Sequence, residues 1–224
     1  MKKICSLLAF AASTSIFAQN SFQGKVVYEM IYSGTEFDAN TIAMMPKETV
    51  IYIKSEKVRS EISIGGMGTS LSIVDNKTKT ATTLMDLMGQ KIAFKANAQD
   101  VEGIQKKSTS EPRVTQLDET KLIAGYKCKK AEIETEVNNE KLKIYVYYTN
   151  EITNGPNNWS SHQYKGIDGF LMEYEIAMQG IKMRMLVKSV SKEDVDDSKF
   201  TIPAGYTEMN QEQIMKAMSG CASK

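Results

Sequence analysis

The sequence contains little of the chemistry on which most enzymes and metal sites depend. Its 224 residues include one histidine, His162, one tryptophan, three cysteines and four prolines. Histidine-ligated zinc sites need more imidazole than this, and a catalytic triad, which needs only one histidine, is not accompanied by a nucleophile motif. His162 stands in a stretch rich in Gly, Asn and Ser, where a solvated loop histidine is expected. We therefore predict no catalytic residue, no cofactor and no enzymatic activity.

The chain also lacks an excess of charge of either sign. Lys and Arg total 28 and Asp and Glu total 27, so the formal net charge is +1. Nucleic acids and anionic membrane surfaces are bound by clustered basic side chains. Neither partner is predicted.

An apolar run long enough to span a bilayer, about 20 residues, is missing as well. Residues 1–18 begin with Lys2 and Lys3, continue through a short apolar stretch and end at Ala18 before polar residues. This pattern is typical of a secretory signal peptide. We expect an exported, periplasmic protein with no spanning helix and one domain, residues 19–224.

Two further patterns lack the features of a ligand site, and a third pattern, rich in sulfur, has a simpler interpretation. Residues 65–68, Gly-Gly-Met-Gly, lack the Lys-Ser/Thr and helix of a phosphate loop, and the acidic residues at 193–197 lack the spacing of a calcium loop. Met215, Met218 and Cys221 offer soft ligands for copper(I). The favoured interpretation of the 14 methionines is core packing, with the lining of an adaptable apolar cavity as an alternative. No metal site is predicted.

Two cysteines remain after removal of the signal peptide, Cys128 and Cys221. In an oxidising compartment such a pair commonly forms a disulfide, and closing so long a loop would stabilise the fold. Two unrelated thiols are the alternative.

Residues 128–137 and 140–149 are β-prone runs separated by Asn138-Asn139, which tolerates the positive φ of a two-residue hairpin turn. This spacing sets the register. The predicted pairs are Val137–Glu140, Glu136–Lys141, Glu134–Lys143, Ile133–Ile144 and Ala131–Val146. A slip by one residue would turn the apolar set out to water, so the hairpin is predicted to have one wet face and one buried face.

Residues 170–190 predict a second hairpin around Gln179-Gly180. Its apolar face would pair Met178–Ile181, Ile176–Met183, Tyr174–Met185 and Met172–Val187. Its reverse face would pair Glu175–Arg184 and Leu171–Lys188. Such alternation is typical of an antiparallel sheet covered on one side.

The rest of the chain fits the same sheet. Alternating or β-rich runs predict strands at residues 24–32, 48–54, 57–64, 69–74, 79–85, 90–95 and 113–124. In the first of them Val26, Tyr28, Met30 and Tyr32 share one side. Residues 35–47 are expected to be a loop with one helical turn, while residues 96–112 and 150–169 read as surface connections. A capping pattern at Asn210 predicts a short helix at about residues 211–219.

Three segments resemble the secreted bacterial family called domain of unknown function 4412. They are Glu119–Lys121 with Ile123–Ala131, then Gly166–Phe170, and Phe200–Tyr206, within a similarity from Gly24 to about Met209. Asp168 stands where relatives often carry Pro. The family is similar to periplasmic lipoprotein carriers and receptors, in which a curved sheet wraps around an apolar cavity. The resemblance implies export and apolar ligand binding, and it supplies no catalytic residue.

We expect a mainly β fold of the α+β class: one curved antiparallel sheet forming an open half-barrel, with short helices over its concave face. The leading hypothesis is a periplasmic carrier for an apolar small molecule, an acyl chain or a lipoprotein. The predicted cavity-lining residues are Met172, Tyr174, Ile176, Met178, Ile181, Met183, Met185 and Val187. The alternative is an envelope interaction module with a solid core that uses surface loops such as residues 150–169. Ligand identity and oligomeric state stay open.

Overall fold

The computed structural model describes residues 21–33, 38–64, 68–87, 89–105, 110–137, 140–153, 158–178, 181–209 and 213. The strands in these ranges are β1 Gln23–Ser33, β2 Glu48–Lys54, β3 Lys57–Ser63, β4 Gly68–Asp75, β5 Thr80–Leu87, β6 Gln90–Asn97, β7 Arg113–Ile123, β8 Tyr126–Val137, β9 Glu140–Thr149, β10 Phe170–Met178, β11 Ile181–Lys192 and β12 Thr207–Met209. The helices are α1 Ala39–Met44, α2 Ala98–Gln105 and the 3-10 turns η2 His162–Tyr164 and η3 Asp197–Phe200.

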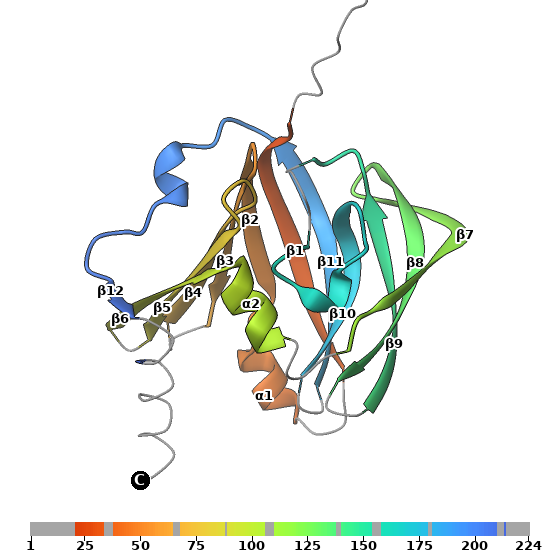
Figure 1. The fold of residues 1–224 in the computed structure, drawn as a ribbon, viewed down its shortest axis with the longest axis horizontal. Helices are drawn as coiled ribbons and strands as arrows, with labels where there is room; N and C mark the ends of the chain where they lie inside the picture. The colour runs from red at the N-terminus through yellow and green to blue at the C-terminus, as the bar shows by residue number, and fades with distance from the viewer. Residues whose placement is uncertain are drawn as a thin grey trace, which may run out of the picture.

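The strands form one sheet in the order β12-β6-β5-β4-β3-β2-β1-β11-β10-β9-β8-β7. Every neighbouring pair is antiparallel except β12 and β6, which run parallel. The sheet bends so that β6 and β7 lie on opposite sides of the molecule, while α2 lies across its front and α1 below it (Figure 1). The predicted open half-barrel with short helices is confirmed.

Both predicted hairpins are present, and the first has the expected register. Its pairs, from Ala131–Val146 to Val137–Glu140, all occur in the ladder between β8 and β9. In the second hairpin the pairs from Tyr174–Met185 to Met178–Ile181 occur, together with Glu175–Arg184. The predicted pairs Met172–Val187 and Leu171–Lys188 are wrong, because the β10–β11 ladder begins only at Glu173.

Two bulges explain this departure. One lies where β10 pairs with β9, between Leu171 and Glu173, and the other lies opposite Val27 and Tyr28, where β11 carries an extra residue. A bulge adds one residue to one strand and turns the following side chains. Here the first half of β10 pairs with β9, and its second half pairs with β11.

Buried side chains form three clusters along the sheet. The largest joins β1, β10 and β11 and includes Val26, Tyr28, Met172, Met185 and Val187. A second lies between β8, β9 and the connection to β10, and a third joins β4, β5 and β6 to residues near η3. Tyr174 packs against both of the first two clusters, so these form a continuous apolar layer, whereas the third cluster is separate.

Residues 96–112 were expected to be a surface connection, and their first half contains the helix α2. Asn97 begins α2 as a reciprocal cap: its side chain accepts hydrogen bonds from the backbone N–H groups of Gln99 and Asp100, at 2.8 and 3.0 Å, and its own N–H donates to the Asp100 carboxylate at 2.9 Å. This arrangement is a capping box. The expected helical turn in residues 35–47 is confirmed as α1, which Asp38 caps.

Several predictions fall on residues outside the described ranges. They are the signal peptide at residues 1–18, the tail helix at 211–219 apart from the helical residue Gln213, the sulfur residues Met215, Met218 and Cys221, and both hairpin turns, residues 138–139 and 179–180.

Candidate functional site

The centre of the concave face is built by β1, β11 and β10. Because alternate residues of a strand share a face, Tyr28 and Met30 of β1 lie beside Val187 and Met185 of β11. Tyr174 of β10 pairs with Met185 on the other side. These residues form an apolar floor that runs across three strands.

The predicted lining residues occupy different positions on this floor. Met172, Met185 and Val187 are buried core residues, while Tyr174, Ile176 and Met183 are half-buried and pack against the same cluster. The side chains of Met178 and Ile181 lie outside what the structure describes. Of the six described side chains, Tyr174 borders a cavity that the structure resolves.

The concave face is occupied by residues 158–169, here called the inner segment. Figure 1 shows this connection from β9 to β10 crossing in front of β1 and β11. Tyr164 and Ile167 are 4% and 2% exposed and pack with Ile133, Val146 and other residues that β8 and β9 turn inward. The Tyr164 hydroxyl donates to the Glu175 carbonyl at 2.7 Å. The expected surface loop is therefore, over this stretch, an internal element.

His162 shares this placement. It is 6% exposed, and its Nε2 lies 3.2 Å from the Ser110 carbonyl oxygen. The expectation of a solvated histidine is wrong, because the 3-10 turn η2 carries His162 and Tyr164 inward together. Successive backbone hydrogen bonds from Ser161 to Asn158, Tyr164 to Ser161 and Ile167 to Tyr164 make the inner segment compact.

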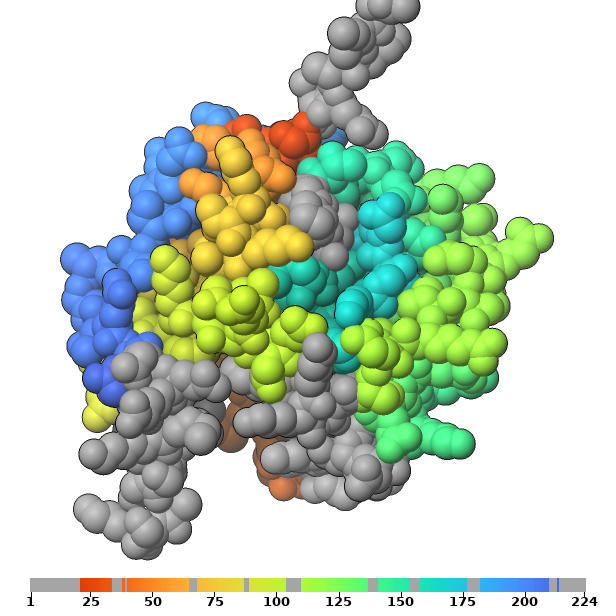
Figure 2. All heavy atoms as spheres, in the orientation of Figure 1, coloured from red at the N-terminus to blue at the C-terminus, as the bar shows by residue number. Residues whose placement is uncertain are grey.

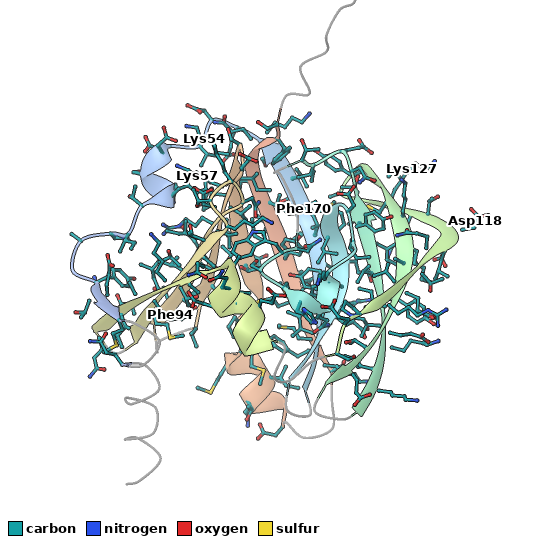
Figure 3. All side chains as sticks on the ribbon, viewed as in Figure 1. Lys54, Lys57, Phe94, Asp118, Lys127 and Phe170 are labelled. Atoms are coloured by element: carbon teal, nitrogen blue, oxygen red, sulfur yellow. The ribbon has the colours of Figure 1, made fainter. Side chains whose placement is uncertain are left out.

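A small cavity remains between the inner segment and β2–β4. We call it the inner cavity, and its volume is about 160 Å³. Its lining residues are Tyr28, Ile51, Val58, Val74, Asn76, Asn158, Ser160, Ser161, Phe170, Leu171 and Tyr174. Among these described lining residues there is no Lys, Arg, His, Asp or Glu, and the lining is apolar on the strand side and neutral polar on the segment side. Figure 3 shows Phe170 in the interior, whereas Asp118 and Lys127 lie at the periphery.

A second space, the outer cleft, adjoins the inner cavity at Asn158. Its volume is about 300 Å³, and it is lined by Lys79, Ala98, Glu102, Asn158, Trp159, His162, Lys165 and Gly166. Figure 2 shows the side chains of α2 and of the inner segment together on this side of the molecule. The outer cleft therefore has a charged lining, in contrast to the inner cavity.

Asn158 lines both spaces, and its neighbour Trp159 lines the outer cleft. Asn158 has a left-handed backbone, φ +62°, and its amide donates to the carbonyls of Ile167 and Gly169 at 3.0 and 3.2 Å. The Trp159 indole donates to the Asn76 side chain at 2.8 Å. These bonds close the inner segment on itself and attach it to the β4–β5 turn. The sequence prediction missed both residues.

Two tyrosines of the inner-cavity lining, Tyr28 and Tyr174, belong to a cluster of three with Tyr164. The ring of Tyr174 contacts Tyr28 and Tyr164 edge to face, with centroids 5.9 and 5.3 Å apart. Burial raises the pKa of Tyr174 to about 12 and also raises the pKa values of Tyr28 and Tyr164. All three hydroxyls therefore stay protonated at neutral pH and can donate hydrogen bonds.

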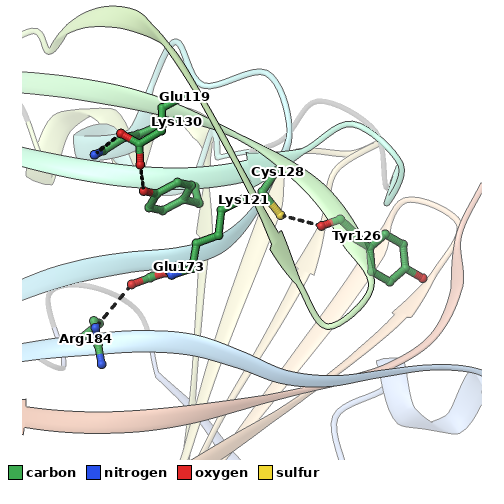
Figure 4. A network of polar contacts seen from close by, with 8 residues as sticks. Glu119, Lys121, Tyr126, Cys128, Lys130, Glu173 and Arg184 are labelled. Carbon is green, nitrogen blue, oxygen red and sulfur yellow. Dashed lines mark hydrogen bonds and ion pairs between the residues drawn. The ribbon is translucent and has the colours of Figure 1, made fainter.

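A polar network covers the convex side of β8–β11 (Figure 4). Lys121 of β7 lies 2.6 Å from Glu173, which also pairs with Arg184 at 3.5 Å, and Lys130 lies 2.8 Å from Glu119. Exposed ion pairs of this kind contribute roughly 0–1 kcal/mol each. We interpret this network as structural, because it fastens the β7–β8 hairpin to β10 and β11.

Cys128 belongs to β8 of the same hairpin and is a fully buried free thiol, which donates weakly to the Tyr126 carbonyl at 3.4 Å. Burial raises its pKa to about 11, so almost no thiolate forms at neutral pH and the group is unreactive. Its predicted disulfide partner, Cys221, lies outside the described residues, and the predicted bridge is not present, because Cys128 is a free thiol.

Comparison with known proteins identifies the family. The model of a domain of unknown function (DUF4412) matches residues 39–206. The chain belongs to this family. The resemblance drawn from the three sequence segments is thereby confirmed, and no functionally curated protein shows a significant match to the chain.

Among solved structures, LprF from Mycobacterium bovis is similar to this chain, with 12% sequence identity and a TM-score of 0.34. The match covers 84% of this chain and 92% of LprF. This likeness is too distant to bear on function. In the described part of the DUF4412 chain, no helix is long and apolar enough to cross a membrane, and no group of three or more His, Cys, Asp or Glu residues could hold a metal ion.

Proposed function

We propose that this chain binds an apolar ligand, an acyl chain or the lipid part of a lipoprotein, and carries it on the concave face without a chemical step. The supporting observation is the inner cavity, which Val58 and Val74 of β3 and β4 line together with Phe170 and Tyr174, and whose described lining contains no charged residue. Apolar walls with a few placed polar groups are typical of sites for apolar ligands. The proposed place of action is the periplasm or another exported location, in keeping with the predicted signal peptide.

The size of the inner cavity limits what it holds in this conformation. Ligand sites commonly enclose about 300–1,000 Å³, and the inner cavity encloses about 160 Å³. A long acyl chain therefore requires the space that the inner segment now fills. We propose that the segment and the ligand compete for the concave face.

The free energies involved allow such a competition. Exposing the side chains of Tyr164 and Ile167 would cost up to about 3 kcal/mol each, and each buried methylene of a ligand returns about 0.8 kcal/mol. Roughly eight methylenes would therefore offset the exposure of both side chains. Short acyl chains are expected to bind weakly, and longer chains are expected to bind with affinity that rises with length.

Titration of delipidated protein with acyl probes of six to sixteen carbons tests this proposal. Trp159 is the only tryptophan of the chain. It belongs to the inner segment and lines the outer cleft, so its fluorescence reports displacement of the segment. We expect saturable binding, a change in Trp159 emission and a steep gain in affinity beyond about eight carbons. The control is Trp159→Phe, in which calorimetry should still detect binding while the fluorescence signal disappears. Absence of binding at every chain length would contradict the proposal.

A protein-interaction module with a solid core is the second candidate, and the burial of Tyr164 and Ile167 in the concave face favours it. Such a module would leave the inner segment in place. The same titration separates the two candidates, because a solid core takes up no probe and leaves Trp159 emission unchanged. Tyr164 and Ile167 of the inner segment are buried, so a partner would meet the exposed residues of the segment, Lys165, Gly166 and Asp168.

A further inference from the structure

The Tyr174 hydroxyl, which borders the inner cavity, has no hydrogen-bond partner among the described residues. Tyr28 donates to the Leu171 carbonyl, and Tyr164 donates to the Glu175 carbonyl at 2.7 Å. Tyr174, which touches both rings, makes no hydrogen bond with any residue that the structure describes. Buried hydroxyls normally have a partner, because leaving one unpaired is destabilising. A ligand in the cavity could supply the missing acceptor.

Tyr174 is positioned to meet such a ligand. It is half-buried because its ring borders the inner cavity, yet it is deep enough for burial to raise its pKa to about 12. It therefore remains a hydrogen-bond donor at any pH at which the protein would work. Ser160, Ser161 and Asn158 add neutral polar groups on the opposite side of the cavity.

The lining also indicates the charge of the acceptor. A carboxylate placed in the inner cavity would lie among neutral side chains, and burying a charge without a counter-charge is strongly unfavourable. Basic groups line the outer cleft, which shares Asn158 with the inner cavity, and one of them, Lys165, already pairs with Glu111 at 2.9 Å. A neutral carbonyl carries no such penalty.

We infer that the inner cavity recognises the neutral carbonyl of an esterified or amide-linked acyl group, with the Tyr174 hydroxyl as the donor, and discriminates against the free fatty acid. This inference rests on the proposed function, since it names the part of the acyl ligand that the site reads. Ester and amide carbonyls occur both in glycerolipids and in lipid-modified polypeptides, and they share the same acceptor chemistry.

The test compares three probes of equal length: methyl dodecanoate, methyl dodecyl ether and dodecanoate, each titrated at pH 8. We expect the ester to bind roughly threefold to tenfold more tightly than the ether, the gain of one neutral hydrogen bond, and more tightly than the carboxylate. In Tyr174→Phe the ester and the ether should bind equally. The ratio of two affinities is used because any change in the position of the inner segment affects both probes alike.

The matched control is Tyr164→Phe, which removes a neighbouring hydroxyl that already has a protein acceptor and does not line the inner cavity. Its ester-to-ether ratio should stay at the wild-type value. Equal binding of ester and ether to the wild type, a preference that survives Tyr174→Phe, or tighter binding of the carboxylate would overturn the inference while leaving acyl carriage intact. Failure of all three probes to bind would instead reject the proposed function, and the inference with it.

Arms with a dioctanoylglycerol and with a short lipidated peptide then identify the source of the carbonyl. Tighter binding of the peptide assigns the site to lipid-modified polypeptides, and tighter binding of the glyceride assigns it to glycerolipids. In either arm the affinity should fall by the same factor in Tyr174→Phe, and an affinity independent of Tyr174 would count against the inference.

Discussion

Gly169 shows how the absence of one side chain sets the contact between the inner segment and β9. A Cβ at this position would lie 2.4 Å from Cδ2 of Tyr148 and 2.9 Å from the Thr149 carbonyl oxygen. Tyr148 is held in place by a hydrogen bond to Gln116 at 2.6 Å. The inner segment and β9 therefore approach each other so closely at this position that only glycine fits.

We predict that Gly169→Ala lowers the free energy of unfolding by about 1–3 kcal/mol, because overpacking forces the Tyr148 ring and the backbone apart. Gly103→Ala is the matched control, since a Cβ there meets no atom within 4 Å and alanine in a helix is favoured by up to about 1 kcal/mol. Urea denaturation measures both. Equal stability of the two variants would show that the contact yields more easily than its geometry indicates.

A second prediction at this scale concerns Cys128. Its pKa is raised from 9.0 to about 11, so the folded state keeps a proton that the unfolded state loses between these values. The thiol thus stabilises the fold fully below about pH 9, and this contribution, on the order of 2 kcal/mol, is lost as pH rises toward 11. In Cys128→Ala the free energy of unfolding should fall less steeply across this interval than in the wild type. Identical slopes in urea titrations from pH 8 to 11 would contradict the prediction.

At the scale of the element, the alternation of side chains predicts the hairpins but not their irregularities. The β8–β9 register follows from opposed acidic and basic residues on one face, such as Glu134 and Lys143, and apolar residues on the other. The bulge between Leu171 and Glu173 leaves no trace in the alternation, because both sides of β10 are apolar there. The α2 helix carried a readable signal, the Asn97 and Asp100 capping pattern.

Glu173 connects three of these elements just after the bulge. Its carboxylate, 12% exposed, bonds Lys121 of β7 and Arg184 of β11. We predict that Glu173→Gln destabilises the protein by about 1 kcal/mol, a modest value because both cations can turn to water. Glu48→Gln breaks an exposed pair with Lys188 at 2.7 Å, and it should change stability by less than about 0.5 kcal/mol. Thermal unfolding in low and high salt compares the variants, and equal effects would remove the special role of Glu173.

At the scale of the whole molecule, sequence patterns predict the curved sheet but not the segment that packs on its concave face. The floor of the concave face was predictable from period-two alternation in β1, β10 and β11. The inner segment was not, because its Gly, Asn and Ser content is that of an exposed loop, while Tyr164 and Ile167 turn inward through contacts with distant strands. Their spacing of three residues, continued by Phe170, is the one local signal that could have indicated a buried face.

The closed position of the inner segment gives the last prediction. The Asn158 amide donates two hydrogen bonds, at 3.0 and 3.2 Å, to carbonyls of the inner segment itself, and these bonds maintain the compact shape in which the segment packs on the concave face. Asn158→Gly removes both donors but keeps the positive φ of +62° accessible. A binding site that is open only part of the time loses apparent affinity in proportion to its closed fraction. Since each hydrogen bond is worth about 0.5–1.5 kcal/mol net, the variant should bind a dodecyl ester up to about tenfold more tightly.

The free Asn158→Gly protein should also show part of the Trp159 emission change that ligand produces in the wild type. Ser55→Gly is the matched control, because Ser55 has a similar φ of +54° in the turn between β2 and β3 and does not line either space. It should alter neither affinity nor emission. If Asn158→Gly leaves both unchanged while its folded stability stays intact, the inner segment does not regulate access to the concave face, and the ligand has to enter past a segment that stays in place.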